Sequence, residues 1–231
     1  MVFFSRYGPS LKTLYFTASL RDLGLIDREI SSQSQDLLNK PAVNGLAQVP
    51  TKPAVLLHIS DLHFGEHAPD SSEFERKHSI LSSLVRSLSK LPSDWSPTIV
   101  CLSGDVAWSA RRDQYDEALT WILNLLSVLG LSPAELVICP GNHDVDRRKI
   151  IDLPLNALDA DARFNTPVSP DDKLHLPFRE FELFCERLGI PRNKCGEEES
   201  YLVGVRQLDR ITFLIQNSAW FAKGDDLGNL W

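Results

Sequence analysis

Three short apolar segments constrain the fold of this chain more than any other feature of its sequence. They are AVLLHIS (54–60), TIVCLS (98–103) and ELVICP (135–140), each of strand length and rich in aliphatic residues. Near-continuous apolar runs of this kind are typical of parallel strands that are covered on both faces. The sequence therefore predicts a sheet with helices packed against it.

Two segments with helical periodicity separate these strands. Apolar residues recur at helical spacing over about 73–90, and Pro92 lies just beyond that segment. Residues 112–129 place their apolar side chains on one face, and Gly130 follows as a C-cap. The order strand, helix, strand, helix, strand predicts an α/β fold with crossover helices.

The rest of the chain gives weaker signals. Residues 1–53 are expected to be a poorly ordered N-terminal extension and linker, because their second half is rich in Ser, Gln, Asn and Pro. One domain is expected over 54–231. Residues 150–177 show little periodicity, a helix is expected over 178–188, and the segments YLVGV and ITFLIQ predict a hairpin.

Composition narrows the classes of function. The 231 residues are 43% hydrophobic, which is enough for a globular domain, and no stretch approaches the length of a transmembrane helix. The formal net charge of -7 argues against broad binding to a nucleic-acid backbone. The four cysteines form no C-x-x-C pair, so we expect reduced thiols and a cytoplasmic location.

Each of the three strands is followed by polar side chains of the kind that bind metals. Asp61 and His63 follow the first strand, Asp105 the second, and Asn142 and His143 the third. Ligands of α/β sheets bind beyond the carboxyl ends of the strands, so these clusters should converge on one rim. Asp61 and His63 are two residues apart, so in an extended segment both side chains would leave on the same side and could bind one ion.

The residue types indicate which ions and which chemistry. Asp105 has two carboxylate oxygens and could bridge two ions, while Asn142 offers a neutral carbonyl oxygen. Mixed carboxylate, imidazole and amide ligands suit Mn, Fe or Zn better than Ca or Mg. Two metals about 3.5–4 Å apart form a clamp for in-line displacement at phosphorus, and a metal-bound water becomes hydroxide near neutral pH.

The order strand-D-x-H, strand-G-D, strand-G-N-H-D resembles the calcineurin-like metallophosphoesterases. The stretches SGDVAWSARRDQYDEA and QNSAW are also similar to that family, so the resemblance covers about residues 54–220. It implies a β-sandwich flanked by helices, in α-β-β-α layers. It also implies two divalent metal ions, with Asp61 and His63 on the first ion. Asp105 would bridge both ions, and Asn142 would bind the second.

The resemblance assigns catalytic roles to the residues that follow. His143 would contact the substrate phosphate together with Asn142, and it would protonate the leaving group. Asp144 would orient and charge His143, a pairing that favours imidazolium. Trp108 is expected to pack rather than to stack on the substrate, although it follows Asp105 closely enough to border the cleft.

The family completes its site with a further His and a Gly-His-x-His motif after the Asn-Ser strand. This chain has no Gly-His dipeptide, and only His175 follows His143. We therefore expect a domain truncated at its C-terminus, with the missing C-terminal half or a covering partner to complete it.

The pattern predicts a metal-dependent phosphoesterase, a hydrolase that cleaves a phosphate ester by attack of metal-activated hydroxide. The expected substrate is a phosphodiester or a nucleotide. The absent histidines leave open an alternative, a non-catalytic or regulatory half-domain with an incomplete metal site. A nuclease is a further alternative, which the acidic balance disfavours, and no membrane partner is expected.

Overall fold

The three apolar runs form neighbouring parallel strands, as their sequence predicts. The computed structural model describes residues 12–15, 54–150, 173–220 and 222. Its first sheet has the spatial order β1 (Lys12–Tyr15), β2 (Val55–Ile59), β3 (Ile99–Ser103) and β4 (Leu136–Cys139). All neighbours in this sheet run parallel. Strand β1 belongs to the expected extension, whose other residues lie outside the described part of the chain.

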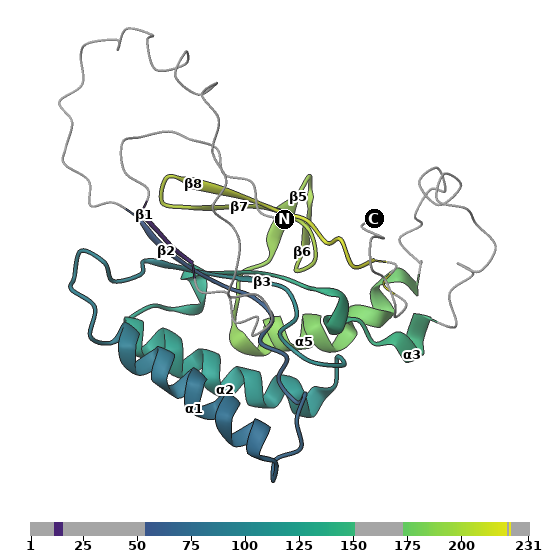
Figure 1. Cartoon of the computed structure of the whole chain (residues 1–231). Helices are drawn as coiled ribbons and strands as arrows, with labels where there is room; N and C mark the ends of the chain where they lie inside the picture. The colour runs from purple at the N-terminus through teal and green to yellow at the C-terminus, as the bar shows by residue number, and fades with distance from the viewer. Residues whose placement is uncertain (1–11, 16–53, 151–172, 221, 223–231) are drawn as a thin grey trace, which may run out of the picture.

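Two crossover helices lie on one face of this sheet. Helix α1 (Ser72–Leu88) connects β2 to β3, and α2 (Arg112–Leu129) connects β3 to β4, so both predicted helices are confirmed. Helix α2 ends at Gly130, whose left-handed backbone (φ 68°) makes the predicted C-cap. Helix α5 (Arg179–Leu188) confirms the third predicted helix and packs beside α2 on the same face (Figure 1).

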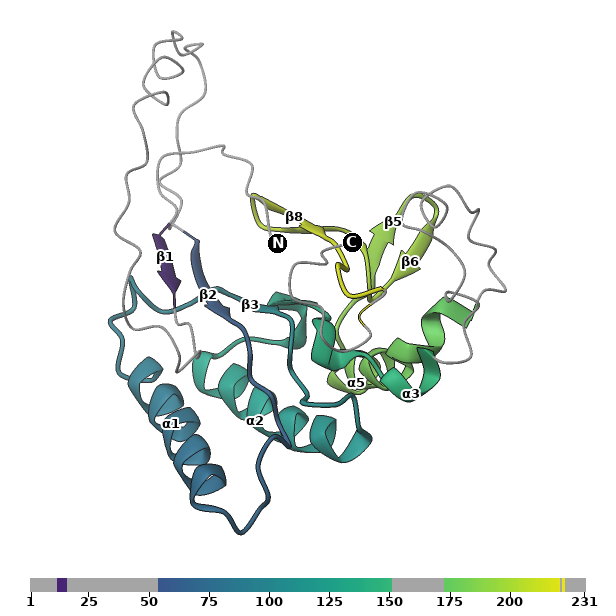
Figure 2. The ribbon, with the colours of Figure 1, turned by 45° about the vertical axis from the view of Figure 1, so that its right-hand side comes forward.

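A second, antiparallel sheet stacks on the opposite face of the parallel sheet. Its spatial order is β6 (Glu198–Ser200), β5 (Asn193–Cys195), β7 (Gly204–Leu208) and β8 (Ile211–Ile215). Strands β7 and β8 confirm the predicted hairpin, although β7 begins at Gly204 rather than at Tyr201. The short, polar strands β5 and β6 were not predicted. Figures 1 and 2 show this sheet and the helices on opposite sides of the parallel sheet.

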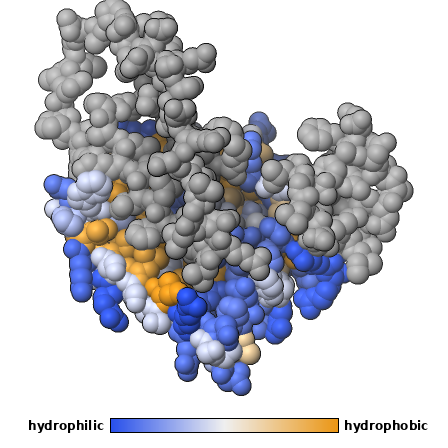
Figure 3. Space-filling view, viewed as in Figure 1, coloured by the Kyte–Doolittle hydropathy of each residue, from blue (hydrophilic) through white to orange (hydrophobic). Residues whose placement is uncertain are grey.

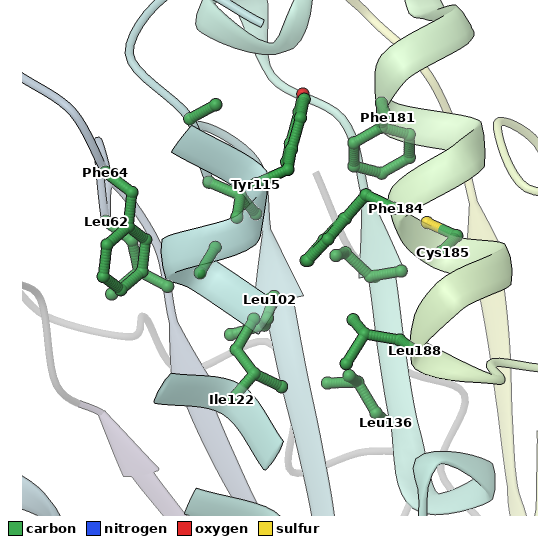
Figure 4. Close-up of a cluster of buried hydrophobic side chains, with 14 of the residues drawn as sticks. Leu62, Phe64, Leu102, Tyr115, Ile122, Leu136, Phe181, Phe184, Cys185 and Leu188 are labelled. Carbon is green, nitrogen blue, oxygen red and sulfur yellow. The ribbon is translucent and has the colours of Figure 1, made fainter. Parts of the chain in front are cut away.

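The alternation of side chains along β2 explains why the parallel strands read as continuous apolar runs. Leu57 and Ile59 belong to the core between the sheet and the helices, whereas Leu56 packs in the core between the two sheets. Figure 4 shows the first core, with Tyr115 and Phe184 between the helices and the strands. Because β2 is buried on both faces, its side chains do not alternate between apolar and polar as those of a half-exposed strand do.

The antiparallel sheet does show that alternation. Phe213 and Ile215 of β8 are buried against the parallel sheet, and Leu214 between them is 43% exposed. Its cross-strand partner Val205 is also 43% exposed. The described residues thus form an α-β-β arrangement, and they include no helix over the outer face of the second sheet.

Short helical turns complete the described chain. They are η2 (Pro133–Glu135), η3 (Asn142–Asp144), α3 (Arg147–Ile150) and η5 (Lys173–Phe178). The turn η3 lies shortly after β4 and contains Asn142, His143 and Asp144 of the third polar motif. The segment predicted to be irregular, 150–177, lies mostly outside the described residues.

The expectations drawn from composition also have structural counterparts. All four cysteines are free thiols, as predicted, and only Cys195 is exposed. None of the helices in the described ranges combines the length and the apolarity needed to cross a membrane. On the face seen in Figure 3, hydrophilic residues border the lower side of a band of hydrophobic residues.

Candidate metal centre

The loops after β2 and β3 stay hydrogen-bonded beyond the ends of their strands. The backbone N–H of Asp61 donates to the carbonyl of Gly104 at 3.3 Å. The N–H of His63 donates to the carbonyl of Asp105 at 2.9 Å, and an isolated parallel bridge continues the pairing at Phe64. These bonds hold the first two polar motifs side by side at the carboxyl end of the sheet, as the parallel order of the strands predicts.

The three polar residues of these loops that are predicted to bind metal all have left-handed backbone conformations. The φ angles are 57° at Asp61, 47° at His63 and 54° at Asp105. Such values are uncommon outside glycine and cost on the order of 1–3 kcal/mol each, and they cluster at functional sites. The prediction that Asp61 and His63 lie in an extended segment is therefore wrong, because left-handed turns, and not strand alternation, orient these side chains.

The third loop meets the second at a glycine. A Cβ atom at Gly141 would overlap Oδ1 of Asp105, so only glycine allows this approach. The same Oδ1 accepts a hydrogen bond from the backbone N–H of His143 at 2.9 Å. The carboxylate of Asp105 is thereby fixed between the second and third loops.

Replacing Gly141 by alanine should displace Asp105 and lower the free energy of unfolding by about 1–3 kcal/mol, the usual effect of overpacking. It should also weaken Mn²⁺ binding, measured by calorimetry. Gly196→Ala controls for a general loss of stability, because its φ of 66° strains an alanine while a Cβ atom there meets nothing within 4 Å. Equal Mn²⁺ affinity in the two variants would contradict the proposed role of this glycine.

These loops bring three potential metal ligands together. Ligand atoms of His63, Asp105 and His143 all lie within 4.8 Å of one another. Nε2 of His63 is 3.4 Å from Oδ2 of Asp105, yet this buried nitrogen makes no hydrogen bond. An unsatisfied buried ring nitrogen beside a carboxylate is unfavourable, and a cation bound there would satisfy both groups. The residues present therefore fit a divalent metal ion.

The electrostatics of Asp105 agree with this reading. Burial acts to raise the pKa of the carboxyl group, but the contact with His63 and the N–H bond from His143 outweigh it, so the pKa is lowered. The carboxylate is consequently ionised at neutral pH, as a metal ligand must be.

The other two predicted ligands, Asp61 and Asn142, lie on the first and the third loop. Asp61 is exposed at the start of the first loop, and Asn142 is half-buried at the start of η3. Their roles as metal ligands stay predictions.

The structure corrects the prediction for Asp144. Its carboxylate is completely buried and accepts hydrogen bonds at 2.9–3.2 Å from the N–H groups of Val106, Ala107 and Gly141 and the hydroxyl of Tyr115. The predicted pairing with the His143 imidazole is wrong, because η3 turns Asp144 into the core. The Nδ1 atom of His143 instead lies 2.7 Å from the carbonyl oxygen of Trp108. Burial raises the pKa of Asp144 to about 6.

A lysine on α1 supports the first loop, and sequence reasoning missed it. Nζ of Lys77 donates to the carbonyl of His63 at 2.6 Å and lies 3.3 Å from a carboxylate oxygen of Glu66. Burial lowers the pKa of this ammonium group, and Glu66 acts in the opposite direction. A lysine within an amphipathic helix gives no sequence signal of such a contact, because it looks like part of a solvated face.

Replacing Lys77 by methionine should weaken Mn²⁺ binding about 10- to 100-fold, the usual effect of losing a group that orients a ligand. It should also lower the free energy of unfolding by about 1–3 kcal/mol, because a hydrogen bond from a charged group is lost. The exposed neighbour Arg76 gives the control variant Arg76→Gln. Calorimetry and urea unfolding measure both effects, and identical behaviour of the two variants would refute this role.

The parallel strands of this α/β sandwich thus present carboxylate and imidazole groups at one rim, where they could hold a metal ion. The family model of the calcineurin-like phosphoesterases matches residues 54–229, and the chain belongs to this family. The family match confirms the resemblance and the fold class drawn from the motifs. A search of curated proteins gave no match.

Proposed function

We propose that this protein is a metal-dependent phosphoesterase whose substrate is a phosphodiester or a nucleotide. Membership of the calcineurin-like family supports a hydrolase that acts on phosphate esters. The observation that carries the proposal for this chain is the grouping of His63, Asp105 and His143 within 4.8 Å. Side chains so close together, with an ionised carboxylate among them, suit divalent cations and the anionic phosphate that these would attract.

The proposed metal site takes residues from all three loops. Asp61 and His63 would bind the first ion, and Asp105 would bridge the first and the second ion. Asn142 would bind the second ion and contact the substrate. Two divalent ions, with Mn first and Fe or Zn as alternatives, would supply Lewis-acid activation of the ester and of the attacking water.

His143 is the proposed general acid. A carbonyl oxygen can only accept a hydrogen bond, so the 2.7 Å contact with Trp108 requires the proton on Nδ1 of His143. In the imidazolium form the second proton is then on Nε2, which is the atom that would protonate the leaving oxygen. Asp144 acts at a distance in this scheme, because its bonds to Ala107 and Gly141 position the loops on either side of the imidazole.

The direct test is hydrolysis by the full 231-residue chain. After treatment with EDTA, the protein should be inactive, and added Mn²⁺ should restore hydrolysis of bis(p-nitrophenyl) phosphate. A phosphoserine peptide should react more slowly than the diester. Binding of Mn²⁺ without turnover of any ester would favour the alternative, a non-catalytic module. Preferred cleavage of DNA or RNA would favour a nuclease, against which the net charge of -7 argues.

We also propose a cytoplasmic location. The support is the state of the four cysteines, which are free and mostly buried, as is usual for proteins in a reducing compartment. A covering partner remains part of the proposal, because Val205 and Leu214 expose an apolar pair on the outer sheet face.

A further inference from the structure

The side chain of Trp108 stands at the edge of the candidate metal centre in a fixed position. Its backbone N–H donates to the carbonyl of Phe64 at 3.0 Å, which ties it to the first loop. Its own carbonyl accepts from Nδ1 of His143 at 2.7 Å, which ties it to the third loop. Both bonds are independent of the indole ring, so the ring itself is available for another purpose.

The indole contacts both imidazoles of the centre. It stacks on His143, with ring centroids 4.4 Å apart and planes 25° apart. It meets His63 edge to face, with centroids 5.2 Å apart. The two imidazoles also contact each other at 4.6 Å. Three mutually touching rings therefore form one wall of the site.

Despite these contacts, Trp108 is 38% exposed, and it borders the site as its place after Asp105 suggests. The exposed part of an indole that borders a site offers an aromatic surface on which a ligand ring can stack. Trp108 therefore both stacks on His143, the proposed acid, and keeps a free surface of its own. A substrate whose phosphate lies near His143 therefore has an aromatic surface within reach of its other end.

We propose that Trp108 is a specificity-determining residue that stacks against a nucleobase of the substrate. The proposal rests on the proposed function and deepens it, because it selects nucleotides among phosphate esters. Stacking of a base on an aromatic side chain typically improves binding by roughly 5- to 150-fold. A ribose phosphate without its base would lose this contribution and keep the contacts of its phosphate.

The test compares two ligands that share a phosphate and a ribose, of which only one carries a base. AMP and ribose 5-phosphate are titrated into the Mn²⁺-loaded full chain by calorimetry. AMP should bind roughly 5- to 150-fold more tightly than ribose 5-phosphate to the wild-type protein. In Trp108→Ala this ratio should fall to about one, because only the stacking contribution is removed, and Trp108→Phe should retain most of it.

Trp95 provides a matched control, because it is another exposed tryptophan, at 42%, on the loop that enters β3 at its opposite end. Trp95→Ala should leave the ratio unchanged. An unchanged ratio in Trp108→Ala, or equal binding of the two ligands to the wild type, would overturn the stacking role. An equal loss for both ligands in Trp108→Ala would also overturn it, since it would show that the indole only positions His143. If neither ligand binds and no ester is hydrolysed, the proposed function itself fails.

Discussion

Replacing Asp105 by asparagine should lower Mn²⁺-dependent hydrolysis of bis(p-nitrophenyl) phosphate by more than about 100-fold, because loss of even an indirect partner of a metal ligand costs 10- to 100-fold. The substitution removes the negative charge and one of two acceptor oxygens. Oδ1 already accepts from the N–H of His143, so an amide that keeps this bond would turn its NH₂ group, and not an oxygen, toward His63 and a cation bound there.

The variant His143→Ala separates a general acid from a metal ligand. If His143 is the general acid, its replacement should reduce turnover by about 10²- to 10⁴-fold. The reduction should be larger for an alkyl phosphodiester than for the nitrophenyl ester, because nitrophenolate leaves without protonation. Mn²⁺ affinity should be preserved. Equal losses for both esters together with weak Mn²⁺ binding would show that His143 is a ligand, and unchanged turnover in both variants would refute the assignment of the site.

Replacing Asp144 by asparagine is expected to have the largest effect on stability. Four donors point at the carboxylate, and the asparagine side chain would turn its own NH₂ group toward some of them. With two or more buried donors unsatisfied, the free energy of unfolding should fall by about 3–5 kcal/mol, at about 1–3 kcal/mol per donor. Urea unfolding at pH 7.5 measures this, since the pKa of about 6 keeps Asp144 mostly ionised there.

Tyr115→Phe is the matched control for that experiment. It removes one hydroxyl donor and leaves the carboxylate with its three N–H partners, so the expected cost is about 1 kcal/mol. If Asp144→Asn costs no more than Tyr115→Phe, the carboxylate does not join the second and third loops as described.

The elements that carry the site could be predicted from the sequence because their signals are strong and local. The runs at 54–60, 98–103 and 135–140 lie between helices of clear period, and parallel order alone requires their ends to share a rim. The parallel order of these strands is therefore enough to predict that Asp105 and His143 lie together. By contrast, strands β5 and β6 are short, and most of their residues are exposed, so neither hydrophobicity nor length distinguishes them from a loop.

The finer geometry of the site depends on backbone conformations that residue types do not announce. A left-handed turn at His63 gives no sequence signal, since non-glycine residues seldom adopt it. The short turn η3 directs the side chain of Asp144 into the core and the side chain of the adjacent His143 toward the cleft. From its sequence context Lys77 is expected on a solvated helix face, and Trp108 is expected to pack. Only their tertiary contacts show that both residues reach the site.

Calorimetric titration of Mn²⁺ into the EDTA-treated full chain measures the metal centre without relying on turnover. Two ions should bind saturably per chain, and Asp105→Asn should weaken this binding at least about 100-fold. Binding of a single ion would contradict the two-metal arrangement. The absence of saturable binding, or an identical isotherm for Asp105→Asn, would contradict the claim that these loops form a metal centre.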